Sequence, residues 1–175
     1  MERRQFIKAS ALAGMGLLGG ASVWLNIGAD KESLTIAVAL SKLEALTDKA
    51  ISYTGSWDPA TVFIHCTQSI EYSMTGYPEH KSDVFKNTAG SLAFSAFALK
   101  GAMAHGLDQP IPGAPAIKSD QHLPLALAQL KKSLIDFSQY EGVLEPHFAY
   151  GELTKDEYEA AHVMHIYNHL QEFSA

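Results

Sequence analysis

The sequence contains one cysteine, Cys66, among its 175 residues. A single thiol cannot form an intramolecular disulfide, a cysteine-based zinc cluster or a C-x-x-C-H haem attachment. Stability must therefore come from a packed core, for which the 47% content of hydrophobic residues is ordinary. Cys66 lies in the apolar stretch VFIHCTQSI, which favours burial and a structural role over a reactive thiol.

Positive charge is also scarce, because 13 Lys and Arg face 19 Asp and Glu, a formal net charge of −6. An acidic chain without a basic cluster is repelled by phosphate backbones and by anionic lipid surfaces. We therefore expect no nucleic-acid partner and, once an N-terminal leader is removed, no membrane contact. The expected partner is a small-molecule substrate or ligand of unknown identity, and the sequence is compatible with a homodimer.

The first 29 residues form a segment of different character. A short basic start, MERRQFIKAS, precedes the apolar and glycine-rich run ALAGMGLLGGASVWLNIGA. The stretch RRQFIK resembles the twin-arginine signature R-R-x-F-L-K, although an ordinary secretory signal or an uncleaved anchor is an alternative. We predict a twin-arginine-type signal peptide over residues 1–29 and a periplasmic domain over residues 30–175. Failure to cleave the signal would leave the protein anchored in the membrane.

Strand signals are almost absent, and apolar residues recur instead at helical steps of three and four. Asp58, Pro59 and Gly76 mark the N-cap, first position and end of one helix, and the pair Thr154 and Glu157 forms the capping-box pattern of the last. Prolines gather in residues 107–121, which predicts a long loop, either a crossover or a lid. Helices are expected within residues 31–55, 56–76, 81–106, 122–142 and 143–175. These elements predict an all-α fold, an antiparallel four-helix bundle with an additional helix and a long crossover loop.

Three histidines stand close together in the last predicted helix, in the stretch HVMHIYNHLQEF of residues 162–173. His162, His165 and His169 share one face with Tyr158. The stripe beside them is apolar and consists of Val163, Ile166, Leu170 and Phe173. The histidines therefore border the core, where a polar cluster is costly unless each member has a partner. A metal ion would remove that cost.

Two imidazoles at positions i and i+4 can share one ion, so His165 and His169 are candidate ligands and a third must come from another element. His65 is the best candidate because it lies mid-helix among apolar residues, and His147 is the reserve. The remaining histidines lie near loops or helix ends and are expected to be solvated: His80, His105 and His122. Without the Glu of H-E-x-x-H, the pair alone is equally compatible with a solvated or hydrogen-bonded helix face.

Four further residues are candidates for a supporting part at this site. Gln68, one turn after His65, could reach a metal-bound water or pair with a neighbouring helix. His162 could orient His165, move protons, or be a polar residue at the edge of the apolar stripe. For Tyr158 and His147, core packing or loop anchoring is the simpler interpretation.

The stretches IHCTQSIEYSMTGYP and HIYNHLQEF together resemble the DinB/YfiT superfamily, whose members are four-helix bundles. The superfamily carries one histidine on the second helix and H-x-x-x-H on a later helix, and His65, His165 and His169 fall at those places. The later motif often continues as H-R-G-Q, whereas this chain has LQE, so roles of that arginine and glutamine do not carry over. The stretch PHFAYGELTKDEYEAAHVMHIYNHL and the leader are similar to an exported branch classed as a domain of unknown function.

The resemblance implies a divalent transition metal, most often zinc or nickel, and in several relatives a low-molecular-weight thiol as cosubstrate. Three imidazoles on one ion leave a coordination position open, which is the layout of a catalytic site. We therefore expect a metal-dependent enzyme, either a hydrolase or a thiol-dependent transferase or isomerase. The alternative is a non-catalytic helical bundle that binds a metal or a ligand in the periplasm.

Overall fold

The structure, a computed structural model of the chain, describes residues 31–118 and 121–175. The predicted signal peptide over residues 1–29 lies outside the described residues. The fold is mostly helical, as predicted, with one small antiparallel sheet in which β1 (Ser52–Tyr53) pairs with β2 (Phe173–Ser174). The helical elements are η2 (Lys31–Leu34), α3 (Ile36–Glu44), α4 (Pro59–Thr75), α5 (Asp83–Phe85), η3 (Lys86–Gly90), α6 (Ser91–Lys100), α7 (Leu123–Gln139) and α8 (Lys155–Leu170).

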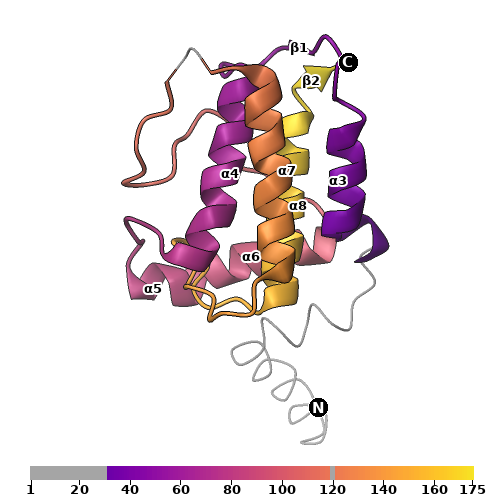
Figure 1. Cartoon of the computed structure of the whole chain (residues 1–175). Helices are drawn as coiled ribbons and strands as arrows, with labels where there is room; N and C mark the ends of the chain where they lie inside the picture. The colour runs from indigo at the N-terminus through magenta and orange to yellow at the C-terminus, as the bar shows by residue number, and fades with distance from the viewer. Residues whose placement is uncertain (1–30, 119–120) are drawn as a thin grey trace, which may run out of the picture.

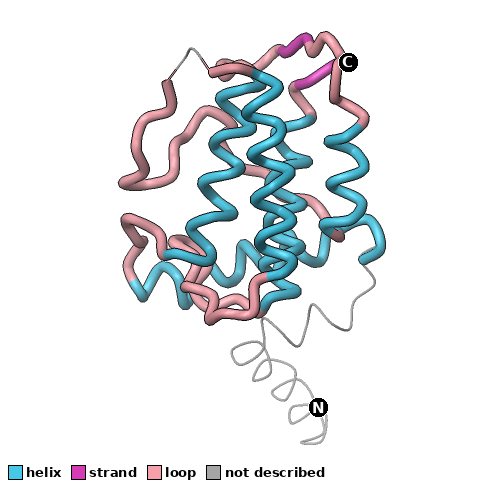
Figure 2. The backbone as a smooth tube through the Cα atoms, in the orientation of Figure 1, coloured by secondary structure: helices cyan, strands magenta, loops and turns pink. Residues whose placement is uncertain are grey.

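Four helices stand side by side in the structure: α3, α4, α7 and α8 (Figure 1). Both α3 and α4 contact both α7 and α8, so the four helices enclose one common core. The helix α6 lies across the lower end in Figure 1 and contacts α8. The described residues between α6 and α7, 101–118 and 121–122, run as a loop beside α4 (Figure 2), in agreement with the loop expected within residues 107–121.

The starts of α4 and α8 agree with their sequence signals. Asp58 is the N-cap of α4 and accepts a hydrogen bond from the backbone N–H of Thr61 at 2.9 Å, and Pro59 occupies the first position. The helix ends at Gly76, whose φ of 98° favours glycine. In α8, Thr154 and Glu157 form a complete capping box. These local hydrogen bonds fix the starts of the two helices that carry the predicted metal ligands.

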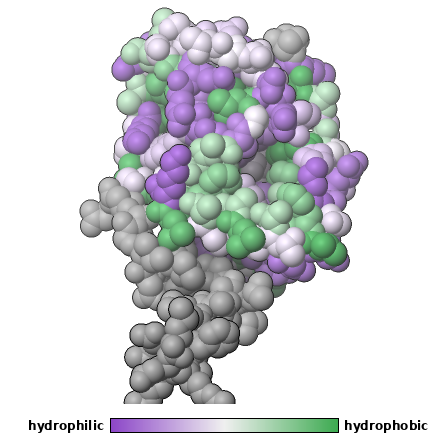
Figure 3. Space-filling model, turned by 180° about the vertical axis from the view of Figure 1, so that it is seen from behind, coloured by the Kyte–Doolittle hydropathy of each residue, from purple (hydrophilic) through white to green (hydrophobic). Residues whose placement is uncertain are grey.

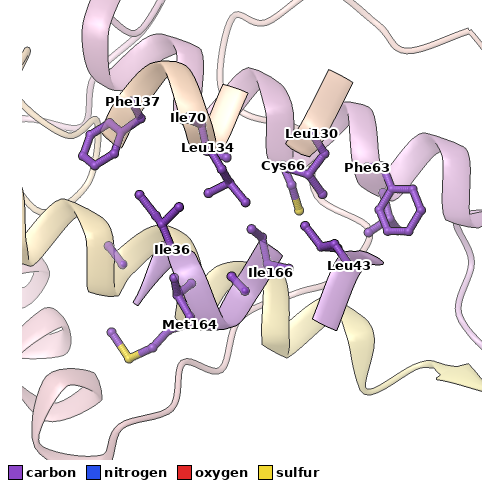
Figure 4. Packing of buried hydrophobic residues seen from close by; sticks show 14 of the residues in the cluster. Ile36, Leu43, Phe63, Cys66, Ile70, Leu130, Leu134, Phe137, Met164 and Ile166 are labelled. Atoms are coloured by element: carbon purple, nitrogen blue, oxygen red, sulfur yellow. The ribbon is translucent and has the colours of Figure 1, made fainter. Parts of the chain in front are cut away.

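The core lies between α3, α4, α7 and α8 (Figure 4). Its fully buried side chains include Leu43 from α3, Phe63 from α4 and Phe137 from α7. Burial of one such side chain contributes about 1.5 to 3 kcal/mol. Cys66 lies in the same core with 1% of its surface exposed, and burial raises the pKa of its thiol. The predicted burial of Cys66 is therefore confirmed.

The first and last helices are shorter than the sequence predicted. The helical spacing predicted one helix within residues 31–55, but α3 ends at Glu44, and Asp48 adopts a left-handed conformation with φ of 61°. Thr47 and Ala50 continued the spacing, yet both are exposed, so no core contact extends the helix to them. Phe173 was placed on the last helix and instead joins β2, because α8 ends at Leu170.

Within residues 81–106, the helical backbone is continuous from Asp83 to Lys100 but changes type along its length. The short helix α5 is followed by a π-helical segment, η3, and then by α6, which ends before Gly101, whose φ is 68°. The π-helical segment ends at Gly90, where an added Cβ would collide with the carbonyl oxygen of Ala149. Residues after Gly101 leave the helical path, which frees His105 to approach α8.

The helix α6 buries only Phe94 and Ala98. Its outer side exposes Leu92 and Leu99, which are 64% and 41% exposed. Seen from behind in Figure 3, hydrophobic residues gather on the lower part of the described surface, the end of the molecule where α6 lies. Among the described residues, no helix has both the length and the apolar character needed to cross a membrane.

Candidate metal centre

Three predicted ligands from two helices converge at one point. His65 comes from α4, and His165 and His169 come from α8. The Nε2 atom of His165 lies 3.2 Å from the Nε2 atom of His65 and 3.2 Å from that of His169. One ligand atom from each histidine lies within 4.8 Å of the other two. Three imidazole nitrogens this close together are suitable for binding one divalent ion.

Burial keeps these imidazoles in the form that binds metals. Desolvation, followed by repulsion from His105, lowers the pKa of His65 to about 4. Desolvation, followed by repulsion from His65 and His105, lowers the pKa of His169 to about 3, and the pKa of His165 is also well below its usual value for the same kinds of reason. All three rings are neutral near neutral pH, so their nitrogen lone pairs are available to a metal ion.

Ring packing orients two of the three histidines. The Nδ1 atoms of His65 and His169 are buried and have no hydrogen-bond partner within the part of the chain that the structure describes. Metal-bound histidines commonly donate from the second nitrogen to an acceptor. Here Trp57 packs against both rings, edge to His65 at a centroid distance of 5.1 Å and stacked on His169 at 6.3 Å. Sequence analysis did not identify Trp57, which lies just before α4 without a motif of its own.

His105 was expected to lie near a loop or helix end and to be solvated, and it is exposed, but its position beside the histidine cluster was not foreseen. Its side chain is exposed, but its ring centroid lies 4.8 Å from that of His165 and 5.2 Å from that of His169. The chain turns out of α6 at Gly101, and the following irregular segment brings His105 to the histidine cluster. No periodic or motif signal in the sequence marks this approach.

Asn168 is a second residue that sequence analysis missed. It lies on α8 beside His169 and is buried. With its amide oriented to satisfy both groups, it donates to the carbonyl oxygen of Met103 at 3.1 Å and accepts from the backbone N–H of His105 at 3.3 Å. Asn168 therefore attaches the segment that carries His105 to the helix that carries two of the predicted ligands.

His162 does not join the converging nitrogens, although it shares their helix. Its Nε2 atom lies 3.1 Å from the hydroxyl oxygen of Ser73, and its ring packs against Phe137 and Tyr158. Burial lowers the pKa of His162 to about 3. His162 is thus a hydrogen-bonded core residue, whereas the sequence placed it at the edge of the apolar stripe or in a supporting part at the site.

The other three supporting candidates are held by backbone groups. Gln68 donates to the carbonyl oxygen of Pro115 at 3.3 Å and so contacts the long loop. The hydroxyl of Tyr158 donates to the carbonyl oxygen of Glu145 at 2.7 Å. The Nδ1 atom of His147 accepts from the backbone N–H groups of Ala149 and Tyr150, which leaves the hydrogen on Nε2. The contacts of Gln68 and Tyr158 join helices to loops, and those of His147 lie within its own loop.

A cavity of about 180 Å³ adjoins the histidine cluster. Its polar wall includes five histidines: His65, His105, His147, His162 and His165. Met103, Ile111 and Phe148 contribute apolar surface. Among the described residues that line the cavity, Lys81 alone has a formal charge at neutral pH. A small molecule in this cavity would therefore contact two of the three converging imidazoles and no carboxylate of the described lining residues.

The fold and the cluster together define a mostly helical protein with three histidines close enough to hold one metal ion. The family model described as protein of unknown function (DUF1569) matches residues 28–175, and the chain belongs to this family. Comparisons with curated proteins and with solved structures returned no match.

Proposed function

We propose that this protein is a divalent-metal-dependent enzyme that acts on a small molecule in the periplasm. The observation that carries the proposal is the position of the three converging histidines beside a cavity of about 180 Å³. The proposed scaffold is a DinB-like antiparallel four-helix bundle formed by α3, α4, α7 and α8. The shared core of these helices and the placement of His65 on one and His165 and His169 on another support this assignment.

The donor set fits zinc or nickel. Neutral imidazoles suit both ions, and three of them leave at least one coordination position free. When bound there, the ion supplies Lewis acidity and lowers the pKa of a water or thiol in the free position. His65, His165 and His169 would hold the ion, and the apolar residues of the cavity would exclude bulk water from a bound substrate.

Hydrolysis is the favoured reaction type, with thiol-dependent transfer second. Cys66 cannot supply the thiol, because it is buried in the core and its pKa is raised. A thiol would have to come from outside the chain, and small thiols are kept reduced mainly in the cytoplasm. Water needs no such supply in the proposed compartment.

Elemental analysis of the purified protein, combined with a substrate screen, tests this proposal. We expect about one zinc or nickel ion per chain, and loss of that ion in the double variant His165→Ala with His169→Ala. The variant His122→Ala, at the exposed N-cap of α7, is the matched control and should keep the ion. Metal-dependent turnover of an ester, amide or thiol-transfer substrate would support the enzyme. An unchanged metal content in the double variant would refute the site.

A non-catalytic metal- or ligand-binding bundle is the second candidate. The observation that favours it is the position of His105 beside His165 and His169, because a fourth protein ligand could close the coordination sphere. Failure of every substrate in the screen, together with a metal ion that does not exchange its bound water, would favour this binder. Fast water exchange and turnover would favour the enzyme.

We further propose that residues 1–29 direct export by the twin-arginine route and that residues 30–175 form the exported domain. The family match begins at residue 28, which supports a leader that precedes the family domain. Substitution of Arg3 and Arg4 by Lys should remove the protein from the periplasmic fraction, because the route recognises the arginine pair. Unchanged periplasmic levels would instead indicate the general secretory route.

A further inference from the structure

The ring of His105 stands at the edge of the histidine cluster and of the cavity. Its centroid lies 4.8 Å from that of His165 and 5.2 Å from that of His169, which is close to the 5.0 Å that separates those two rings from each other. His105 and Gly106 both line the cavity. His105 therefore lies beside the converging histidines and lines the same cavity as His65 and His165.

The hydrogen-bond partner of His105 determines which of its nitrogens is free. Its Nδ1 atom lies 2.9 Å from the carbonyl oxygen of Gly106. A carbonyl oxygen can only accept, so Nδ1 carries the hydrogen and Nε2 keeps an unprotonated lone pair. A ring nitrogen that donates to a backbone carbonyl, with the other nitrogen left for the metal, is the usual arrangement of a metal-bound histidine.

His105 lies on a different kind of backbone element from the other three histidines. His65, His165 and His169 are carried by long helices, and two of them are buried. His105 is exposed, and its segment after α6 is attached to α8 by the two hydrogen bonds of Asn168. The attachment positions the ring near the cluster, while exposure allows the ring to leave without disturbing the core.

We propose that His105 is a fourth, exchangeable ligand of the metal ion held by His65, His165 and His169. The inference rests on the proposed metal site and extends it. His105 stands outside the group of three histidines whose nitrogens lie within 4.8 Å of one another, so its exposed ring would have to move toward them to bind the ion through Nε2. A small anionic ligand that reaches the ion competes with His105 for a coordination position. Lys81, the charged residue of the cavity lining, favours an anion there.

The proposal predicts opposite changes in two measured affinities. Removal of the His105 imidazole should weaken binding of the metal, because one ligand is lost. It should also strengthen binding of an added anion to the bound metal, because the competitor is gone. A residue with only a structural role would not produce this opposite pair of changes.

The test uses Co(II) as the metal probe and azide as the anion, with the purified full chain. We expect His105→Ala to bind about one Co(II) with affinity reduced by at least about tenfold. Its visible absorption spectrum should change with the ligand set, and azide should bind more tightly by about tenfold. Asn168→Ala removes the hydrogen bonds that hold the His105 segment. It should likewise weaken Co(II) binding, change the absorption spectrum and strengthen azide binding. The exposed His122→Ala variant should match the unsubstituted protein, and circular dichroism would check that each variant is folded.

The outcomes separate this inference from the proposed function. If the unsubstituted protein binds Co(II) through the other three histidines and His105→Ala changes neither affinity nor spectrum, His105 is not a ligand and only this inference is overturned. If the absorption spectrum of His105→Ala changes but azide binds this variant no more tightly than the unsubstituted protein, His105 is a ligand that does not exchange. The exchange part of the proposal is then overturned. If the unsubstituted protein binds no Co(II), the proposed metal site itself fails.

Discussion

His162 and His165 are one turn apart on α8, yet their side chains make different contacts. The imidazole of His165 faces His65 and His169, whereas that of His162 contacts the hydroxyl of Ser73. The Ser73 hydroxyl donates to the carbonyl oxygen of Ile70, so it accepts from the Nε2 hydrogen of His162. The hydrogen bond positions the ring of His162, and burial keeps it neutral by lowering its pKa. Its buried neutral ring has a consequence for the pH dependence of stability.

The first prediction concerns that pH dependence. The pKa of His162 is lowered by burial from 6.5 to about 3. Between these values the unfolded chain binds a proton that the folded chain does not, so stability falls as pH falls from about 6.5 toward 3. The slope reaches about 1.4 kcal/mol per pH unit for this residue. His162→Gln keeps a donor toward Ser73 and removes the titration, so the free energy of unfolding in urea should fall less between about pH 7 and pH 5 than in the unsubstituted protein. An equal fall in both proteins would contradict this account.

The second prediction concerns Trp57, which contacts the candidate metal site without being one of its proposed ligands. Its indole packs against the rings of His65 and His169, whose Nδ1 atoms have no hydrogen-bond partner among the described residues. Trp57→Leu keeps an apolar side chain but removes the planar surface that orients the rings. We expect zinc affinity to fall about tenfold with the stoichiometry unchanged, as for loss of an orienting partner. Competition titration with a chelator would measure this, and an unchanged affinity would show that the rings are oriented in another way.

Among the elements, those with strong local signals were predictable from the sequence. Asp58, Pro59 and Gly76 fixed the bounds of α4, and the capping box of Thr154 and Glu157 fixed the start of α8. These signals act over three or four residues, so the sequence contains them in full. The convergence of His65 with His165 and His169 followed from helical spacing and a family resemblance. The only tertiary contact that this prediction requires is the packing of α4 against α8.

Elements and contacts that depend on distant partners were not predictable. β1 and β2 have two residues each, too few to show a strand period, and they exist because Tyr53 meets Phe173. The need for a residue without a Cβ at Gly90 depends on the carbonyl of Ala149, which lies far along the chain. The approach of His105 depends on Asn168 of α8. Each of these features is set by tertiary structure rather than by local sequence.

The third prediction concerns the π-helical segment η3. A Cβ at Gly90 would collide with the backbone oxygen of Ala149, which cannot move as a flexible side chain would. Gly90→Ala should therefore lower the free energy of unfolding by about 1 to 3 kcal/mol, the usual cost of overpacking, although alanine is the better helix former. Ala89→Ser, at the exposed neighbouring position of the same segment, should change stability by less than about 0.5 kcal/mol. Equal effects of the two substitutions in urea unfolding would contradict the close contact.

At the scale of the whole molecule, the histidine cluster connects segments that are distant in the chain. His65 and His165 are 100 residues apart in sequence, and the segment that carries His105 lies between them. The Nε2 atom of His165 lies within hydrogen-bond distance of the Nε2 atoms of His65 and His169, and two of the Nδ1 atoms have no partner in the described structure. A bound ion would replace these contacts by coordinate bonds and join α4 to α8. Metal binding there would therefore be coupled to folding stability.

The last prediction follows from this coupling. A ligand that binds only the folded chain stabilises it by about 2.7 kcal/mol when present at about 100 times its dissociation constant. For a domain of this size, each kcal/mol raises Tm by roughly 2 to 4 °C, so zinc should raise Tm by roughly 5 to 10 °C over the chelator-treated protein. The double variant His165→Ala with His169→Ala should show no such rise, whereas His122→Ala should show the full rise. Differential scanning calorimetry near neutral pH would measure these shifts. A rise of equal size in the double variant would place the stabilising ion elsewhere in the molecule.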